Sequence, residues 1–174
     1  MAIDKEGMKR FFFIAAAFAF ALSFQILSVS GRAREDRIYV VVSGKLSRTT
    51  VSPGETVNIT LTIRIDAAYH INSHEPNLDT QIPTVLIFEP HEHAVFDDLA
   101  YPEGVMKKFS YSDVEISIYE GEVVLTSKLG LSKECPPGKN IIEGKLFFQA
   151  CDDQGCLPPA EEAFEIPFEV KAGK

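Results

Sequence analysis

Two cysteines near the C-terminal end of the chain, Cys151 and Cys156, have the side chains best suited to chemistry. They stand in "FFQACDDQGCLPP", residues 147–159, with four residues between them. This spacing differs from the C-x-x-C of thioredoxin-like redox motifs and of zinc ribbons. The pair is therefore open to three interpretations: a structural disulfide, a redox-active disulfide or a pair of metal ligands.

The residues around the pair predict a hairpin that brings the two sulfurs together. "GKLFFQAC", residues 144–151, is typical of a strand, and "DDQG" supplies turn residues, with Gly155 able to adopt a left-handed conformation. Cross-strand neighbours have Cβ atoms about 4.5–5.5 Å apart, and a disulfide needs about 3.5–4.5 Å. A disulfide between Cys151 and Cys156 is therefore feasible after a small adjustment.

The short loop between the cysteines limits what a disulfide would add to stability. Closing a loop of about six residues contributes roughly 2 kcal/mol in the chain-entropy model. A bond between distant segments would contribute more, so this one is suited to being reduced and re-formed. Two sulfurs alone do not complete a tetrahedral metal site, which makes metal binding the least favoured interpretation. The redox and structural interpretations stay equally open on these grounds.

The N-terminal segment predicts export. Basic residues among the first ten positions precede an uncharged apolar run from Phe11 to Phe24, a pattern typical of a secretory signal. We expect residues 1–30 to be a cleaved signal peptide and residues 31–174 to be one domain; the alternative is an uncleaved anchor that tethers the domain. The predicted location is the periplasm, an oxidising compartment in which disulfides persist.

Composition excludes some classes of partner. The chain has 174 residues, with 17 basic and 25 acidic side chains and a formal net charge of −8. An acidic domain without a basic stripe is a poor binder of nucleic acid and of anionic membrane surfaces. The sequence contains no Gly-rich phosphate loop and no nucleophile-elbow serine, and we expect no cofactor and no metal.

Alternating hydrophobicity predicts an all-β domain. "ETVNITLTIRI", residues 55–65, places every second side chain on one face, and "AFEIPFEV", residues 163–170, repeats the pattern. Pro167 cannot donate to a ladder, so we expect the second segment to be an edge strand. Further strand candidates are 37–43, 84–90, 114–119, 122–129 and 144–151. Short strands separated by turns favour an immunoglobulin-like antiparallel β-sandwich.

Three stretches of the chain resemble a known family. They are "YHINSHEPNLDTQIPT" at 69–84, "YPEGVMKKFSYSDVEISIYEGEVVL" at 101–125 and the cysteine segment at 147–159. In this order they are similar to the N-terminal periplasmic domain of the disulfide-interchange protein DsbD, over about residues 40–170. The resemblance implies an immunoglobulin-like fold with a redox pair on adjacent antiparallel strands.

The resemblance also implies a role for each cysteine and a set of partners. Cys156 would form the mixed disulfide with a partner, and Cys151 would resolve it. In the family, a thioredoxin-like domain fed through a membrane domain reduces this domain, which then reduces periplasmic disulfide isomerases and thioredoxins of cytochrome c maturation. We therefore expect a protein-disulfide reductase component that depends on partners, with a membrane electron-transfer protein supplied in trans.

A cap over the redox pair is a further implication of the resemblance. In the family, an aromatic residue of a loop shields the cysteines when no partner is docked. The matching stretch is "KKFSYSD", residues 107–113, so Phe109 or Tyr111 would be the cap. Shielding of this kind limits stray oxidation of a thiolate. The alternative is that both rings are ordinary packing residues.

Two other hypotheses compete with the redox relay. One is a non-catalytic binding module in which the hairpin disulfide is only structural. The other is a metal carrier that uses His91 and His93, which the "HEH" stretch could place on one side of a strand. Cys135, in the turn "KECPPGKN", is expected to be an inert thiol, and His70 and His74 to be part of loop architecture.

Overall fold

The computed structural model describes residues 39–172, which form an all-β domain. The predicted signal peptide, residues 1–30, lies outside the described residues. No helix capable of crossing a membrane occurs between residues 39 and 172. The strands are β1 (Val40–Leu46), β2 (Thr50–Val51), β3 (Thr56–Ile65), β4 (His70–Asn72), β5 (Val85–Phe88), β6 (Ala94–Phe96), β7 (Val105–Lys107), β8 (Ile116–Tyr119), β9 (Glu122–Leu131), β10 (Gly138–Phe148), β11 (Ala150–Cys151) and β12 (Ala160–Val170).

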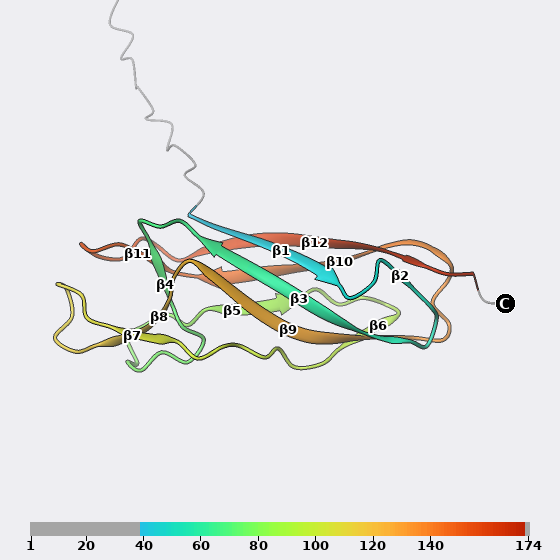
Figure 1. The fold of residues 1–174 in the computed structure, drawn as a ribbon, viewed down its shortest axis with the longest axis horizontal. Coiled ribbons are helices and arrows are strands. Elements are labelled where there is room, and N and C mark those ends of the chain that lie inside the picture. The colour runs from blue at the N-terminus through green and yellow to red at the C-terminus, as the bar shows by residue number, and fades with distance from the viewer. Residues whose placement is uncertain (1–38, 173–174) are drawn as a thin grey trace, which may run out of the picture. The chain divides into compact units, whose positions relative to one another are not determined.

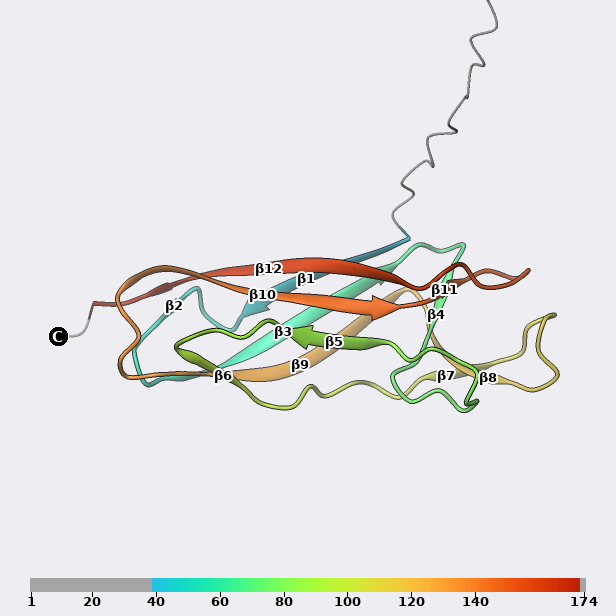
Figure 2. The ribbon, with the colours of Figure 1, turned by 180° about the vertical axis from the view of Figure 1, so that it is seen from behind.

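The strands form three four-stranded sheets. Two of them, β1-β3-β9-β6 and β2-β12-β10-β5, contain the long strands and face each other as the two layers of a sandwich (Figures 1 and 2). The third sheet, β11-β4-β8-β7, is built from short strands and lies at one end of the sandwich. The cysteine hairpin lies at this end. The two long sheets therefore form the core of the domain, and the small sheet positions Cys151.

The core follows the alternation in the sequence. In β3 the inward residues are almost completely buried, and β12 buries every second residue in the same way. The inward residues of these two strands are Val57, Ile59, Leu61, Ile63 and Ile65 in β3 and Phe164, Ile166, Phe168 and Val170 in β12. The prediction of an all-β, immunoglobulin-like sandwich is confirmed.

The edges of the sheets differ slightly from the prediction. β12 pairs with β10 along its whole length, and on its other side only its last two residues pair with β2. Pro167, which has no N–H, therefore lies where the far side of β12 is unpaired, as expected for an edge strand. The pairing of β2 with β12 is parallel, whereas we expected antiparallel pairing throughout.

The segment predicted as a single strand, residues 144–151, is divided between two sheets. β10 ends at Phe148, and after Gln149 the chain enters β11, which pairs with β4 in the small sheet. The short strands β2, β4, β6 and β7 were not predicted, because two or three residues are too few to show a period. This change of sheet at Gln149 carries Cys151 out of the sandwich and into the site.

Candidate functional site

The two cysteines face each other across a tight hairpin and are joined by a disulfide. The N–H of Leu157 donates to the carbonyl of Ala150 at 2.8 Å, and the N–H of Asp152 donates to the carbonyl of Gly155 at 2.9 Å. These bonds flank Cys151 and Cys156 and make them a non-hydrogen-bonded pair, the kind in which side chains lie closest. Their Cα atoms are 3.9 Å apart and the S–S distance is 2.03 Å.

The turn between the cysteines is held by an aspartate. Oδ1 of Asp152 accepts the N–H groups of Gln154 at 2.8 Å and Gly155 at 3.1 Å, which forms an Asx turn. Gly155 does not adopt the left-handed conformation that we expected of it. The side chain of Asp152 therefore stabilises the turn, which we had expected a left-handed Gly155 to close.

The two cysteines differ in their access to solvent. Cys151 is 0% exposed, whereas Cys156 belongs to the exposed surface of the hairpin. Cys156 is accessible from solvent, whereas Cys151 is completely buried. The disulfide thus has one accessible end and one protected end.

The residues that flank the hairpin explain why it leaves the long sheet. Phe148 pairs with Ala160 in β10–β12, and Cys151 pairs with Cys156, so Gln149 lies opposite the two residues Pro158 and Pro159. Two residues opposite one form a bulge, which bends a ladder. Prolines cannot donate hydrogen bonds, and the ladder is interrupted here. The side chain of Gln149 bridges the gap by donating from Nε2 to the Leu157 carbonyl at 3.0 Å.

His70 lies directly opposite Cys151 on β4 and was not predicted to belong to the site. The register pairs Cys151 with His70, and the histidine is 4% exposed. Its ring stacks on Phe109, with centroids 4.1 Å apart and planes inclined by 17°. Its Nε2 forms a 2.8 Å hydrogen bond with the hydroxyl of Tyr111. The imidazole therefore contacts both candidate cap residues, and the backbone of His70 is the cross-strand neighbour of the buried Cys151.

The loop that contains the candidate cap residues reaches the cysteine hairpin. Ser110 Oγ donates to the carbonyl of Asp153 at the hairpin tip, at 2.8 Å, and both segments lie at the same end of the domain (Figures 1 and 2). Tyr111 is 37% exposed, while Phe109 is 6% exposed. Phe109 belongs to a small apolar cluster, separate from the main core, with Ile116, Ile118 and Leu78. The rings of Phe109 and Tyr111 also stack on each other and on His70, so the three form one aromatic stack.

The charges around the stack favour an uncharged imidazole. Burial lowers the pKa of His70 from its ordinary value, and the positive charge of Lys107 acts in the same direction. Nearby carboxylates oppose this shift more weakly; they belong to Asp153, Glu120 and Asp152. Burial also raises the pKa of Tyr111, as does the negative charge of Asp153. His70 is thus a neutral hydrogen-bonding group near pH 7.

The other residues singled out in the sequence lie away from this site. Cys135 is a buried free thiol in the connection between β9 and β10. His91 and His93 lie between β5 and β6, where Nδ1 of His91 accepts the N–H of His93 at 3.2 Å. Within residues 39–172, no three His, Cys, Asp or Glu side chains lie close enough to hold a metal ion.

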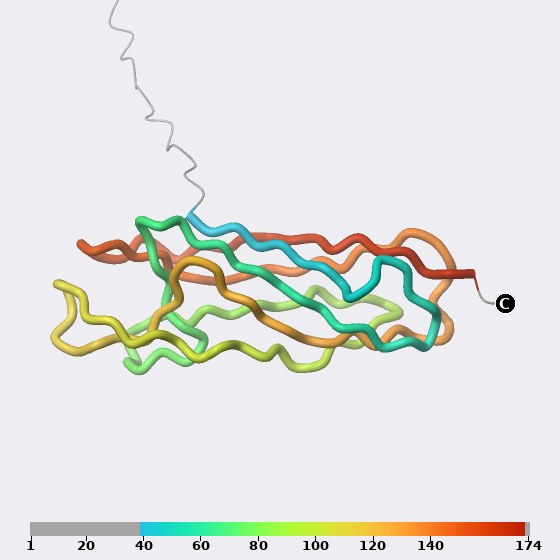
Figure 3. Tube along the Cα trace, in the orientation of Figure 1, coloured from blue at the N-terminus to red at the C-terminus, as the bar shows by residue number. Residues whose placement is uncertain are grey.

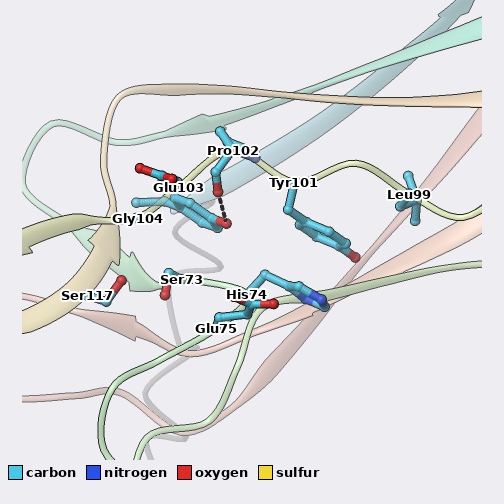
Figure 4. Close-up of a pocket in the computed structure, with 10 residues that line it drawn as sticks. Ser73, His74, Glu75, Leu99, Tyr101, Pro102, Glu103, Gly104 and Ser117 are labelled. Atoms are coloured by element: carbon cyan, nitrogen blue, oxygen red, sulfur yellow. Dashed lines mark hydrogen bonds between the residues drawn. The ribbon is translucent and has the colours of Figure 1, made fainter.

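A cavity of about 450 Å³ lies beside the small sheet. Figure 4 shows the rings of His74 and Tyr101 side by side in its lining, and their centroids are 3.7 Å apart. The hydroxyl of Tyr119, another lining residue, donates to the Pro102 carbonyl at 2.8 Å. Nδ1 of His74 is hydrogen-bonded to the carbonyl of Thr84 at 2.9 Å, so it is already engaged. Neither Cys151 nor Cys156 lines the cavity, so it is separate from the disulfide.

The roles of His70 and Gln149 in the site were not predicted from the sequence, for different reasons. Nothing in "YHIN" shows that His70 pairs with Cys151, because the sequence of one strand does not determine its register with a distant strand. Gln149 was recognised as part of a family-like motif, but its bridging bond depends on a bulge. The adjacent Pro158 and Pro159 were the available signal, since two prolines cannot continue a ladder.

Comparison with solved structures shows a shared fold. The N-terminal periplasmic domain of ScsB from Proteus mirabilis is 15% identical, with a TM-score of 0.50, over 75% of this chain and 47% of that one. The chain thus spans about half the length of this relative. A complex of the DsbD and PilB N-terminal domains from Neisseria meningitidis is also similar, with 15% identity and a TM-score of 0.41, over 71% of this chain and 80% of that one.

Comparison with protein families gives a match over most of the chain. No curated protein matches the sequence. Residues 40–167 match the family described as "Thiol:disulfide interchange protein DsbD, N-terminal", which covers every strand of the described domain except the last residues of β12. Together with the hairpin disulfide, this match shows that the chain belongs to the family of N-terminal domains of the thiol:disulfide interchange protein DsbD.

Proposed function

We propose that this domain is a periplasmic thiol–disulfide exchange module that passes reducing equivalents from a thioredoxin-like donor to oxidised exported proteins. The observation that carries the proposal is the asymmetry of the disulfide, in which Cys156 is exposed and Cys151 is 0% exposed. Family membership supports thiol–disulfide interchange as the reaction. The identity of the partners and the roles of the two sulfurs are our proposal.

The reaction consists of two thiol–disulfide exchanges in each direction. When the domain is reduced, a donor thiolate attacks Sγ of Cys156, the Cys151–Cys156 bond breaks, and Cys151 leaves as a thiolate that takes up a proton. A second donor thiol then attacks the donor's own sulfur in the mixed disulfide and releases Cys156. The donor becomes a disulfide and the domain a dithiol, with two electrons and two protons transferred.

When the domain reduces an acceptor, the same steps run in reverse. The Cys156 thiolate attacks the acceptor disulfide, forms a mixed disulfide and expels one acceptor sulfur. Cys151 then attacks Cys156, the domain disulfide re-forms, and the acceptor leaves as a dithiol. We propose that the donor is itself reduced by a membrane electron-transfer protein, and that the acceptors include thioredoxin-like proteins of cytochrome c maturation.

The cap loop protects the pair between these encounters. Phe109 and Tyr111 stack with His70, which lies opposite Cys151, and Ser110 ties their loop to the hairpin at Asp153. Docking of a partner on Cys156 would displace Ser110 from the hairpin tip and move the loop aside. We propose that this opening makes room for a partner over the exposed Cys156, and that the closed loop keeps Cys151 covered at other times.

Trapping of a mixed disulfide tests the proposed roles. A Cys151→Ala variant is mixed with thioredoxin whose second active-site cysteine is replaced by alanine and whose remaining thiol is activated as a mixed disulfide with thionitrobenzoate. We expect a covalent complex through Cys156, visible on a non-reducing gel. The matched Cys156→Ala variant should give none at the same concentration. Equal trapping by both variants would contradict the assignment of the attacking sulfur.

The reduction potential separates a working disulfide from a structural one. Structural disulfides of exported proteins typically have potentials below about −300 mV. We expect the Cys151–Cys156 pair to lie above this value when equilibrated with glutathione or dithiothreitol buffers and quantified by thiol alkylation. A lower value would favour the binding-module hypothesis, in which the hairpin disulfide is only structural.

A further inference from the structure

The resolving cysteine is buried, and this creates a problem of proton transfer. A thiolate is the nucleophile in disulfide exchange, and burial in apolar surroundings disfavours the thiolate. Cys151 is 0% exposed, so water does not reach it to take its proton. A resolving step at neutral pH therefore requires a proton acceptor among the neighbouring side chains.

His70 occupies the position that such an acceptor needs. It is the cross-strand partner of Cys151, while Cys156 is the partner on the other side. Residues directly opposite each other share a face of the sheet and have Cβ atoms about 4.5–5.5 Å apart. The side chains of His70, Cys151 and Cys156 therefore form one row, with the buried sulfur between the imidazole and the exposed sulfur.

The contacts of the imidazole leave one nitrogen available. Nε2 is hydrogen-bonded to the Tyr111 hydroxyl at 2.8 Å, whereas Nδ1 has no hydrogen-bond partner within residues 39–172. When Nε2 carries the hydrogen and donates it to Tyr111, Nδ1 is the basic nitrogen. Tyr111 is 37% exposed, so the residue bonded to the imidazole also reaches solvent.

We propose that the His70 imidazole accepts the thiol proton of Cys151 when this cysteine resolves a mixed disulfide on Cys156. The Cys151–Cys156 bond forms, the bond from Cys156 to the partner breaks, and the partner's sulfur leaves as a thiolate. The imidazolium passes its proton through the Tyr111 hydroxyl to solvent. In the opposite direction the imidazolium returns a proton to the departing Cys151 sulfur. This inference rests on the proposed function, because it assumes that Cys151 is the resolving residue.

Several ionisable groups surround His70 and set its charge. They come from every element packed around the ring and comprise Tyr111 of the cap loop, Lys107 of β7, Glu120 after β8, and Asp152 and Asp153 of the hairpin. Lys107 and Glu120 form an ion pair, with Nζ and Oε2 2.7 Å apart, so their charges largely offset each other. Burial remains the largest influence and keeps the imidazole neutral and able to accept a proton.

A two-phase reaction with dithiobis-nitrobenzoate tests this role on the reduced full chain. Attack by Cys156 releases a first thionitrobenzoate, and attack by Cys151 on the mixed disulfide releases a second. All variants carry Cys135→Ala, so that no third thiol contributes. The test variant is His70→Phe, which keeps a ring to stack on Phe109 but has no nitrogen.

We expect the substitution to slow only the second phase of thionitrobenzoate release, by a factor that depends on pH. At pH 7 we expect the second phase of His70→Phe to be about 100-fold slower, the lower range for general base catalysis. The difference should shrink towards pH 9, where a larger fraction of the thiol is ionised without a base, and the first phase should change less than about twofold. His70→Gln, which keeps a polar group near Tyr111 but is not a base, should behave in the same way.

Two kinds of outcome would overturn the inference. An unchanged second phase, or one slowed by the same factor at every pH, would show that His70 is only a packing residue. Absence of a second phase in the protein with native His70 would instead contradict the proposed function, because Cys151 would not resolve the mixed disulfide. The two failures are therefore distinguishable in one experiment.

Discussion

The domain places one buried cysteine beyond each end of β10. The two are almost equally buried but differ in their bonding and in their neighbours. Cys135 lies in the connection that precedes β10, and Cys151 lies in the hairpin that follows it; Figure 3 shows these segments at opposite ends of the sandwich. Their exposed fractions are 3% and 0%. Burial alone therefore does not distinguish the cysteine that we propose to be reactive, Cys151, from the one that we expect to be inert, Cys135.

The surroundings of the two sulfurs make the difference. Cys135 packs in the main apolar core, its Sγ donates a weak hydrogen bond to the carbonyl of Pro136 at 3.9 Å, and burial raises the pKa of its thiol. Cys151 is bonded to the sulfur of Cys156 across the hairpin, and on its other side it pairs with His70 of β4. In our proposal, the buried Cys151 can take part in exchange because the exposed Cys156 contacts the partner and His70 accepts the thiol proton.

The largest effect is expected from removing the exposed sulfur. Cys156→Ser should abolish exchange with a thioredoxin-like partner, because the remaining Cys151 is covered. Cys135→Ser, the matched change at the other end of β10, should leave the exchange rate within about twofold. Insulin-type reduction assays, or direct exchange with reduced thioredoxin followed by alkylation, measure both rates. Residual exchange in Cys156→Ser, or a large loss in Cys135→Ser, would mean that the assignment of the two ends is wrong.

A smaller effect is expected from opening the cap. Phe109→Ala removes a ring that packs on His70 and on a small apolar cluster, and replacing a buried phenylalanine by alanine typically costs about 3–5 kcal/mol. We expect a loss near the lower end, about 3 kcal/mol in urea unfolding, because the cluster is small. Reduction of the disulfide by a phosphine should also be about tenfold faster.

Tyr111→Phe is the matched control for the cap. It keeps the ring and removes only the hydroxyl that bonds to His70, so the loss in unfolding free energy should be about 1 kcal/mol. The rate of reduction by the phosphine should remain close to that of the unaltered protein. If Phe109→Ala left this rate unchanged while destabilising the domain, Phe109 would be a packing residue without a shielding role.

The long strands were predictable because their signal is local. β3 alternates over all ten of its residues and β12 from Phe164 to Val170, and burial follows the alternation in both stretches. Each such strand needs only its own sequence to reveal which face is buried. The sandwich and the cysteine pair could therefore be recognised without knowing how any two strands were aligned.

The site was less predictable because it depends on pairings between distant segments. His70 acquires its position from the register with Cys151, and Ser110 meets Asp153 only because two loops end at the same place. The left-handed glycine expected at Gly155 was replaced by an Asx turn from Asp152, since either device can close such a turn. Local sequence does not decide between equivalent solutions of this kind.

A modest effect is expected where the hairpin joins the sandwich. Gln149→Ala removes the bond to the Leu157 carbonyl and should reduce the unfolding free energy by about 1 kcal/mol. Gln154→Ala, at the exposed tip of the same hairpin, is the matched control and should change it by less than about 0.5 kcal/mol. Urea unfolding at constant pH measures both, and equal values would show that the Gln149 bridge does not support the hairpin.

The smallest effect is expected from the titration of Cys135. Because burial raises the pKa of this thiol, the folded protein binds the proton more tightly than the unfolded chain does. The resulting stability is fully present below the ordinary thiol pKa of about 8.5 and declines as the pH rises above it. In the oxidised protein Cys151 and Cys156 do not titrate, so among the described residues this thiol contribution comes from Cys135 alone. The difference in unfolding free energy between the unaltered protein and Cys135→Ala should therefore shrink between pH 8 and pH 9.5, and a constant difference would show that Cys135 is not shielded from solvent as Cys151 is.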